Sequence, residues 1–278
     1  MPEAVIASYN VHGGVDGWGR PFDVLAVCRS LDADVLVLQE SWAPEDGVAL
    51  HDAVAGAMGY SAVRFEPLSP GRITVPPTDP GPRWGPPVRA RSGYGMRLVR
   101  YRAGLTATRV TPPAPDGRVQ RGEWGVALLS RLPVLSTDVI ELDTLPSDPA
   151  RRAAIVADVA VGAERLVLRV AGTHLAHITQ GSPGHLGVLR RRLVPDAHSD
   201  GPSRFVLTGD MNMWGPPLVL QLPGWSRAVR GRTWPTWAPT PFAQADHVLV
   251  RGDVRVRRGT VVRAGRSDHL PVRAELAL

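Results

Sequence analysis

Residues 205–215 read FVLTGDMNMWG, and the interpretation of the remaining chain starts from this stretch. The apolar run FVL is cut off by Gly209, a pattern that predicts a short buried strand. Asp210 and Asn212 follow at the end of that strand, where rigid scaffolds present reactive groups. Asp210 offers a charged oxygen, whereas Asn212 both accepts and donates hydrogen bonds. Taken alone, the motif Gly-Asp-x-Asn favours an ordinary turn. A catalytic role for Asp210 and Asn212 is therefore indicated only if other strand ends carry residues of matching chemistry.

Polar side chains also stand at the ends of other predicted strands. Residues 4–10 (AVIASYN) close with Asn10, and residues 34–38 (DVLVL) stop shortly before Glu40. Further polar residues next to strand ends are His174, Asp246, Asp268 and His269. Carboxylate and amide oxygens are hard ligands suited to Mg²⁺, Mn²⁺ or Ca²⁺. Phosphate-ester hydrolysis needs a cation, a positioned water and proton-transfer groups, and this set of side chains supplies all three.

The composition is that of an ordinary globular protein of 278 residues, 44% hydrophobic and 21% charged. The single cysteine, Cys28, cannot form an internal disulfide, and its apolar surroundings favour a small buried residue over a nucleophile. No stretch is long and apolar enough to span a membrane, and the first residues lack the pattern of a secretory signal. We therefore expect a cytoplasmic protein.

The net charge of +6 favours polyanionic partners such as nucleic acid or phosphorylated small molecules. However, all 32 basic residues are arginine. Together with the richness in alanine, glycine and proline, this indicates a genome-wide codon bias. The charge alone therefore supports nucleic-acid binding only modestly.

Predicted strands dominate the chain, helices fall between them, and no repeat or linker divides it. Helices are predicted at residues 21–31, 45–58 and 184–197. Loops are predicted at 66–92, 111–121 and 225–241. Further strands are predicted at 60–65, 94–101, 105–110, 124–130, 134–142, 152–161, 165–171, 246–251, 254–264 and 269–278. The first of these loops is so rich in proline, glycine and arginine that it predicts a long flap. The pattern predicts one α/β domain over residues 1–278, built on two packed sheets.

These motifs resemble those of the endonuclease/exonuclease/phosphatase superfamily, which includes pancreatic-type deoxyribonuclease, abasic-site endonucleases, neutral sphingomyelinases and inositol polyphosphate phosphatases. The matching segments run in the family's order along almost the whole chain: YN at 9–10, LQE at 38–40, GVALLSR at 125–131, THL at 173–175, GDMN at 209–212, ADH at 245–247 and SDH at 267–269. Each segment is weak alone, but their shared order is a strong signal. The resemblance implies a four-layer α/β sandwich with two packed mixed β-sheets flanked by helices, and a cleft at one end of the sheets.

The resemblance also implies a metal site. Glu40 would be the principal ligand, with Asn10 beside it, and Asp268 would support the metal region or a second cation. Mg²⁺ is the implied cofactor, and Mn²⁺ is an alternative. Some relatives carry an acidic residue two places after the first-strand asparagine, where this chain has His12. For that reason we expect fewer protein ligands around the metal, with Asp16 as a candidate for the missing acidic ligand.

The implied catalytic residues come from the later motifs. His174 would hydrogen-bond the scissile phosphate, Asp210 would orient or deprotonate the attacking water, and Asn212 would fix water or phosphate. Asp246 would hold His269 in one tautomer, and His269 would act as general acid/base or stabilise the transition state. A sixth residue, Arg152, is a candidate phosphate-binding group, although it is equally well read as surface charge.

The predicted function is divalent-metal-dependent hydrolysis of a phosphodiester, with nucleic acid as the expected substrate. Four tryptophans near the site in sequence are candidates for stacking on bases, or simply anchors of a proline-rich loop: Trp214, Trp225, Trp234 and Trp237. The alternative substrate is a phospholipid head group, a phosphoinositide or another small phosphorylated molecule. A third hypothesis, a binding module without activity, conflicts with the nearly complete catalytic set. We expect a monomer.

Overall fold

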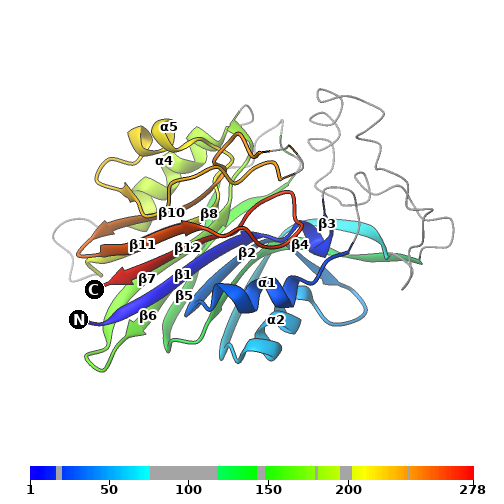
Figure 1. Cartoon of the computed structure of the whole chain (residues 1–278), viewed down its shortest axis with the longest axis horizontal. Coiled ribbons are helices and arrows are strands. Elements are labelled where there is room, and N and C mark those ends of the chain that lie inside the picture. The colour runs from blue at the N-terminus through cyan, green and yellow to red at the C-terminus, as the bar shows by residue number, and fades with distance from the viewer. Residues whose placement is uncertain are drawn as a thin grey trace.

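The computed structural model describes residues 1–16, 21–75, 118–142, 148, 150–178, 181–194, 202–236, 238 and 240–278. Two β-sheets pack face to face, and helices cover their outer faces (Figure 1). The blue helices α1 (Val24–Leu31) and α2 (Leu50–Met58) lie on one side, and α4 (Ser182–Leu193) and α5 (Gly215–Gln221) on the other. The predicted four-layer α/β sandwich is confirmed.

The first sheet has the strand order β11-β12-β1-β2-β4-β3. Its strands are β1 (Glu3–Asn10), β2 (Val35–Pro44), β3 (Ala62–Val75), β4 (Arg118–Ser130), β11 (Arg255–Val261) and β12 (Val272–Ala277). The central strands β1 and β2 are parallel, and Asn10 pairs with Gln39. Because parallel strands end at the same edge of a sheet, the sequence after β1 emerges beside the later part of β2.

The second sheet has the order β5-β6-β7-β8-β10-β9. Its strands are β5 (Val134–Leu142), β6 (Arg152–Val161), β7 (Leu166–His174), β8 (Arg204–Asp210), β9 (Ser226–Arg227) and β10 (Asp246–Gly252). Strands β7 and β8 are parallel, and His174 pairs with Asp210. Strand β10 runs antiparallel to β8, so its first residue, Asp246, also lies opposite Asp210.

Three apolar clusters hold the four layers together. The cluster between the sheets joins β-branched and leucine side chains of both inner faces, including Ile6, Val37, Leu128, Ile155, Val170, Val206 and Val248. Helices α4 and α5 pack on the second sheet, whereas α1 and α2 pack on the first. Such strands, buried on both faces, are expected to be almost continuously apolar, and the run VLVL at the start of β2 shows this pattern. Cys28 belongs to the layer of α1, as its apolar surroundings predict.

The element boundaries differ from the sequence prediction in several places. Helix α1 begins at Val24 because the Asp23 side chain caps it, accepting a hydrogen bond from Ala26 N at 2.8 Å. Residues 66–75 continue β3 as a long hairpin with β4, so the predicted loop at 66–92 is wrong over its first part. The predicted loop at 111–121 is likewise wrong at its end, where β4 begins. The hairpin expected at 94–101 and 105–110 lies outside the described residues.

None of the helices in the described part of the chain has the length and apolar character needed to cross a bilayer.

Candidate active site

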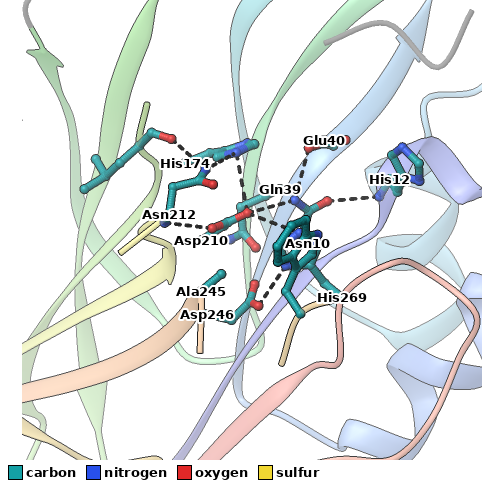
Figure 2. A network of polar contacts seen from close by, with 12 residues as sticks. Asn10, His12, Gln39, Glu40, His174, Asp210, Asn212, Ala245, Asp246 and His269 are labelled. Carbon is teal, nitrogen blue, oxygen red and sulfur yellow. Dashed lines mark hydrogen bonds and ion pairs between the residues drawn. The ribbon is translucent and has the colours of Figure 1, made fainter. Parts of the chain in front are cut away.

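The strand ends of both sheets bring the predicted polar residues together, as Figure 2 shows. Asn10 ends β1, and His174 and Asp210 end the parallel strands β7 and β8. Glu40 lies within β2, which continues to Pro44, so the prediction that this strand stops before Glu40 is wrong. All of these side chains are buried. The close approach of β7 and β8 explains Gly209: a Cβ there would lie 1.9 Å from the carbonyl oxygen of Thr173.

Asp210 stands at the centre of the cluster. Its Oδ2 accepts a hydrogen bond from Asn10 Nδ2 at 3.1 Å, and its Oδ1 accepts one from the backbone N–H of Asn212 at 2.9 Å. Burial raises the pKa of Asp210 to about 7, and the charge of Asp246 adds to this, whereas His269 and the two hydrogen bonds oppose it. A carboxylate that gives up its proton near neutral pH is suited to act as a general base.

His269 lies between two carboxylates. Its Nδ1 is 2.8 Å from Asp246 Oδ2, and its Nε2 is 3.6 Å from Asp210 Oδ2. Burial by itself would lower the pKa of His269, but the charges of Asp246, Asp210 and Asp268 outweigh it and raise that pKa well above its ordinary value. His269 therefore holds a proton on each nitrogen, donates Nδ1–H to Asp246, and presents Nε2–H to the cluster.

His174 has the opposite character. Its Nε2 lies 3.2 Å from Asn212 Nδ2 and 3.6 Å from Asp210 Oδ2. Burial, then the positive charges of Arg152 and His269, hold the pKa of His174 well below its ordinary value. Because an amide Nδ2 can only donate, the neutral imidazole accepts that hydrogen bond at Nε2 and carries its proton on Nδ1.

Arg152 is buried behind His174. Its Nε donates to Asp148 Oδ2 at 2.7 Å, and its Nη1 donates to the carbonyl oxygen of His174 at 3.2 Å. These contacts fix the backbone that carries His174. Asp148 belongs to none of the sequence motifs, and only its charge four residues before Arg152 indicates this pair.

Glu40 lies beside Asn10, whose Nδ2 donates to Glu40 Oε1 at 3.1 Å. The pairing of β2 with β4 shifts register between Leu38 and Ser41, and bulges of this kind re-aim side chains next to active sites. Glu40 has a φ of 51°, and two other residues of the cluster, His12 and Asn212, have φ values of 47° and 49°. Left-handed backbone at non-glycine residues is costly and concentrates at functional sites.

Asp268 approaches the cluster from the loop before β12. Its Oδ2 accepts a hydrogen bond from Trp234 Nε1 at 3.3 Å, and its Oδ1 lies 3.6 Å from His12 Nδ1. The preceding residue, Ser267, donates from Oγ to the carbonyl oxygen of Asn10 at 2.6 Å. The loop is therefore tied to the end of β1, next to Glu40.

Two groups of side chains in this cluster could hold a cation. The ligand atoms of Asp210, Asp246 and His269 lie within 4.8 Å of one another, but both nitrogens of His269 face carboxylates and carry protons, which suits proton transfer better than metal binding. Asn10 and Glu40, which are hydrogen-bonded to each other, and Asp268 offer oxygens of the kind that a hard divalent cation prefers. The buried Nδ1 of His12 makes no hydrogen bond to any described residue and lies 3.6 Å from Asp268 Oδ1.

The four tryptophans expected near the site have different surroundings. Trp225 is buried and packs on Phe205, so it anchors structure. The Trp234 ring lies 6.4 Å from that of His269. Trp214 is 56% exposed, and Trp237 lies outside the described residues. His247 is buried in β10, and its Nε2 donates to the carbonyl oxygen of Met213 at 2.9 Å.

The comparisons with known proteins agree with this architecture. The model of the Endonuclease/Exonuclease/phosphatase family matches residues 7–269. The chain therefore belongs to this family, whose members are hydrolases that act on phosphate esters. No curated protein matches the chain.

Solved structures show the same fold at low sequence identity. An endonuclease/exonuclease/phosphatase from Beutenbergia cavernae has a TM-score of 0.64 at 20% identity, covering 100% of this chain and 72% of its own. The human nocturnin catalytic domain with a bound sulfate anion has a TM-score of 0.63 at 15% identity, covering 99% and 93%. A mannosyl-6-phosphatase from Bacteroides thetaiotaomicron has a TM-score of 0.61 at 15% identity, covering 99% and 100%.

Proposed function

We propose that this chain is a single-domain, divalent-metal-dependent phosphodiesterase that hydrolyses its substrate with an activated water. One observation supports this most directly. The Oδ2 of the buried Asp210 lies 3.6 Å from the Nε2 atoms of both His174 and His269. A base flanked by one neutral and one protonated imidazole has partners for both the attacking water and the phosphate.

Asp210 is the proposed general base. Its hydrogen bonds from Asn10 and from the backbone of Asn212 orient the carboxylate and leave it able to accept a proton from water. Asn212 also donates from Nδ2 to the carbonyl oxygen of Leu175 at 3.0 Å. This contact holds the amide beside His174, where the two side chains can bind a phosphate oxygen or position the water.

His269 is the proposed electrophile and acid. Its Nε2–H can donate to the negative charge that develops on the phosphate or on the leaving oxygen, while Asp246 keeps the ring oriented and charged. His174 carries its proton on Nδ1, and the nearby negative charge of a phosphate would favour its protonated form. Arg152 is proposed to position His174, and direct contact of Arg152 with substrate stays a prediction.

Asn10, Glu40 and Asp268 are the proposed metal-binding residues, with Mg²⁺ as the cation and Mn²⁺ as the alternative. When bound, the cation neutralises charge on the phosphate and polarises its ester bond. The hydrogen bond from Asn10 Nδ2 to Glu40 Oε1 holds the Glu40 carboxylate in place. Asn10 also contacts Asp210, so one amide connects the metal side of the cluster with the general base.

Nucleic acid is the proposed substrate. The net charge of +6 and the exposed Trp214 suit a polyanion with bases that can stack. The second candidate is a small phosphate ester or a lipid head group, because the similar fold from Bacteroides thetaiotaomicron is named a mannosyl-6-phosphatase. The cytoplasmic location and the monomeric state stay predictions.

A substrate panel tests the proposal. Plasmid DNA, single-stranded DNA, RNA, sphingomyelin, phosphoinositides and sugar phosphates are incubated with the protein and Mg²⁺, or with excess chelator. Nicking or nucleotide release that requires the metal and is lost in Glu40→Ala supports the nuclease. Turnover of a small ester or lipid with nucleic acids intact selects the second candidate. Wild-type rates equal to those of Glu40→Ala on every substrate would contradict both and favour a binding module.

A further inference from the structure

The sequence between Asp210 and Asp268 carries an unbalanced positive charge. It holds nine arginines, and its acidic residues are Asp246 and Asp253. Asp246 is buried in the active site, so Asp253 is the one acidic residue of this stretch that lies outside it. A codon bias explains why the cations are arginines. It does not explain why carboxylates are missing from the exposed positions of this stretch.

The segment after β9 packs against the end of β11. A Cβ at Gly231 would lie 2.7 Å from Cγ2 of Val261, the last residue of β11. Arg230 and Arg232 flank that glycine, and Arg263 follows Val261 by two residues. The two pieces of backbone that carry these three arginines are therefore neighbours in space, although they are far apart in the sequence.

Both pieces of backbone lead directly into the active site. Arg232 precedes a buried threonine whose Oγ1 accepts a hydrogen bond from the backbone N–H of Asp246 at 3.2 Å. Arg266 precedes a buried serine whose Oγ accepts one from the backbone N–H of His269 at 3.3 Å. Arg232 and Arg266 are thus each one residue away from a hydroxyl group that holds the Asp246–His269 pair in place.

Four of the arginines, called the arginine patch below, are exposed and form no ion pair with any described residue: Arg230, Arg232, Arg263 and Arg266. Within β11, by contrast, Arg257 pairs with Glu3. Burial, and then the positive charge of Arg230, lower the pKa of Arg227, so like charges are crowded here. Crowded cations without a carboxylate partner favour an anion supplied from outside the protein.

We propose that the arginine patch binds the phosphate backbone of a single-stranded nucleic acid whose scissile phosphate lies at His269. The proposal rests on the proposed phosphodiesterase function and narrows its substrate to a chain of several phosphates. A small phosphate ester ends at the active site and would leave the four guanidinium groups without an anion. A polynucleotide supplies a phosphate with every nucleotide, and arginine binds phosphate through paired hydrogen bonds.

An aromatic side chain beside the patch favours a nucleic acid over an anionic membrane surface. Phe242 is 49% exposed and packs edge-on against Trp234, with 5.6 Å between the ring centroids. Trp234 follows Arg232 by two residues. Arginines for the backbone and an aromatic face for an unpaired base are combined in proteins that bind single strands. A membrane surface needs a broader apolar face, whereas Phe242 is the one exposed large hydrophobic side chain among the described residues of 225–268.

The test measures binding in the absence of cleavage. A fluorescein-labelled single-stranded DNA of about 20 nucleotides is titrated with the full chain in excess chelator, and fluorescence anisotropy gives Kd at several salt concentrations. The patch variant combines Arg230→Gln, Arg232→Gln, Arg263→Gln and Arg266→Gln. The matched control combines Arg29→Gln, Arg190→Gln, Arg191→Gln and Arg192→Gln, which change exposed positions of α1 and α4 and lower the net charge equally. Circular dichroism checks that both variants are folded.

The patch variant should bind the DNA at least ~10-fold more weakly than the wild type. The dependence of log Kd on log salt concentration should become shallower by about 2 to 3, because each lost phosphate contact of a single strand removes about 0.7 from that slope. The control variant should keep the wild-type slope, since its arginines lie away from the active site.

Each other outcome has a definite meaning. Equal losses in the two variants would show that overall charge binds the DNA, and would overturn the patch. Vesicles of anionic phospholipid are titrated in parallel, and binding to them that depends on the patch, with DNA binding unchanged, would assign the arginines to a lipid surface instead. A wild type that hydrolyses a small ester but does not bind DNA would overturn this inference and leave the phosphodiesterase intact. Patch-dependent DNA binding without hydrolysis of any substrate would support the patch and contradict the proposed activity.

Discussion

The Nδ1 of His269 lies 2.8 Å from Oδ2 of Asp246, and both side chains are buried. The Asp246 Oδ1 atom makes no hydrogen bond to any described residue. Among the described residues, the Asp246 carboxylate therefore accepts its side-chain hydrogen bond from the imidazole of His269. This pair connects the last loop of the first sheet to β10 of the second, and Asp246 contributes most among the three carboxylates that raise the pKa of His269.

The first prediction concerns this pair. Asp246→Asn should lower kcat at least ~100-fold, because the neutral amide no longer stabilises the imidazolium and can impose the wrong tautomer. KM should change far less, since Asp246 is not proposed to contact substrate. Steady-state kinetics on the substrate that the panel identifies measures both. A fall confined to KM would remove Asp246 from the role of orienting His269.

The second prediction separates the base from the electrophile. His269→Ala should reduce turnover at least ~100-fold, the scale of losing an acid/base group. The double variant, which carries both Asp210→Asn and His269→Ala, should lose far less transition-state stabilisation than the sum of the losses in the two single variants. The reason is that both residues act on one step. Rates of both single variants and the double variant measure this coupling. Losses that add fully would indicate separate steps.

The third prediction compares two neighbouring arginines. Arg152 forms a buried pair with Asp148, with side-chain exposures of 4% and 3%, whereas the Arg151 side chain is 38% exposed. Arg152→Ala leaves an uncompensated buried carboxylate and should lower the free energy of unfolding by about 3–5 kcal/mol. Arg151→Ala, the matched control, should cost less than about 1 kcal/mol. Urea denaturation measures both, and equal losses would contradict the structural role of Arg152.

The fourth prediction is a loss of stability in acid. Burial lowers the pKa of His247 from 6.5 to about 4, so the unfolded chain binds a proton that the folded chain does not. Stability is therefore full above pH 6.5 and falls as the pH drops towards 4, by about 3 kcal/mol from this residue. His247→Gln, which keeps a donor for Met213, should show a smaller loss over this range. An unchanged pH slope in unfolding experiments would argue against a neutral buried His247.

Much of the fold was predictable because apolar strands and their polar ends are local signals. The run VLVL before Glu40 and FVL before Asp210 identified central strands of both sheets, and Asn10, His174 and Asp246 followed from the same logic. The extension of β3 past Glu66 was not predictable, because prolines and glycines there favour a loop and only pairing with β4 overrides this preference.

Some parts of the site depend on contacts that no local pattern records. The burial of Arg152 against Asp148 requires the fold, as does the position of Trp234 beside Asp268. His12 was visible as a departure at an expected acidic position. The short distance between the His12 and Asp268 side chains, however, depends on a turn that packs on Trp124. The roles assigned to these residues stay predictions until the variants are measured.

The central claim is that Asp210 activates water for attack on a phosphate ester with the help of a divalent cation. The most direct measurement is the single-turnover hydrolysis rate of Asp210→Asn, at saturating Mg²⁺ or Mn²⁺, on the substrate that the wild type cleaves. The account predicts a loss of at least ~100-fold with substrate binding retained. A variant that hydrolyses at the wild-type rate, or a wild type equally fast in chelator, would contradict it.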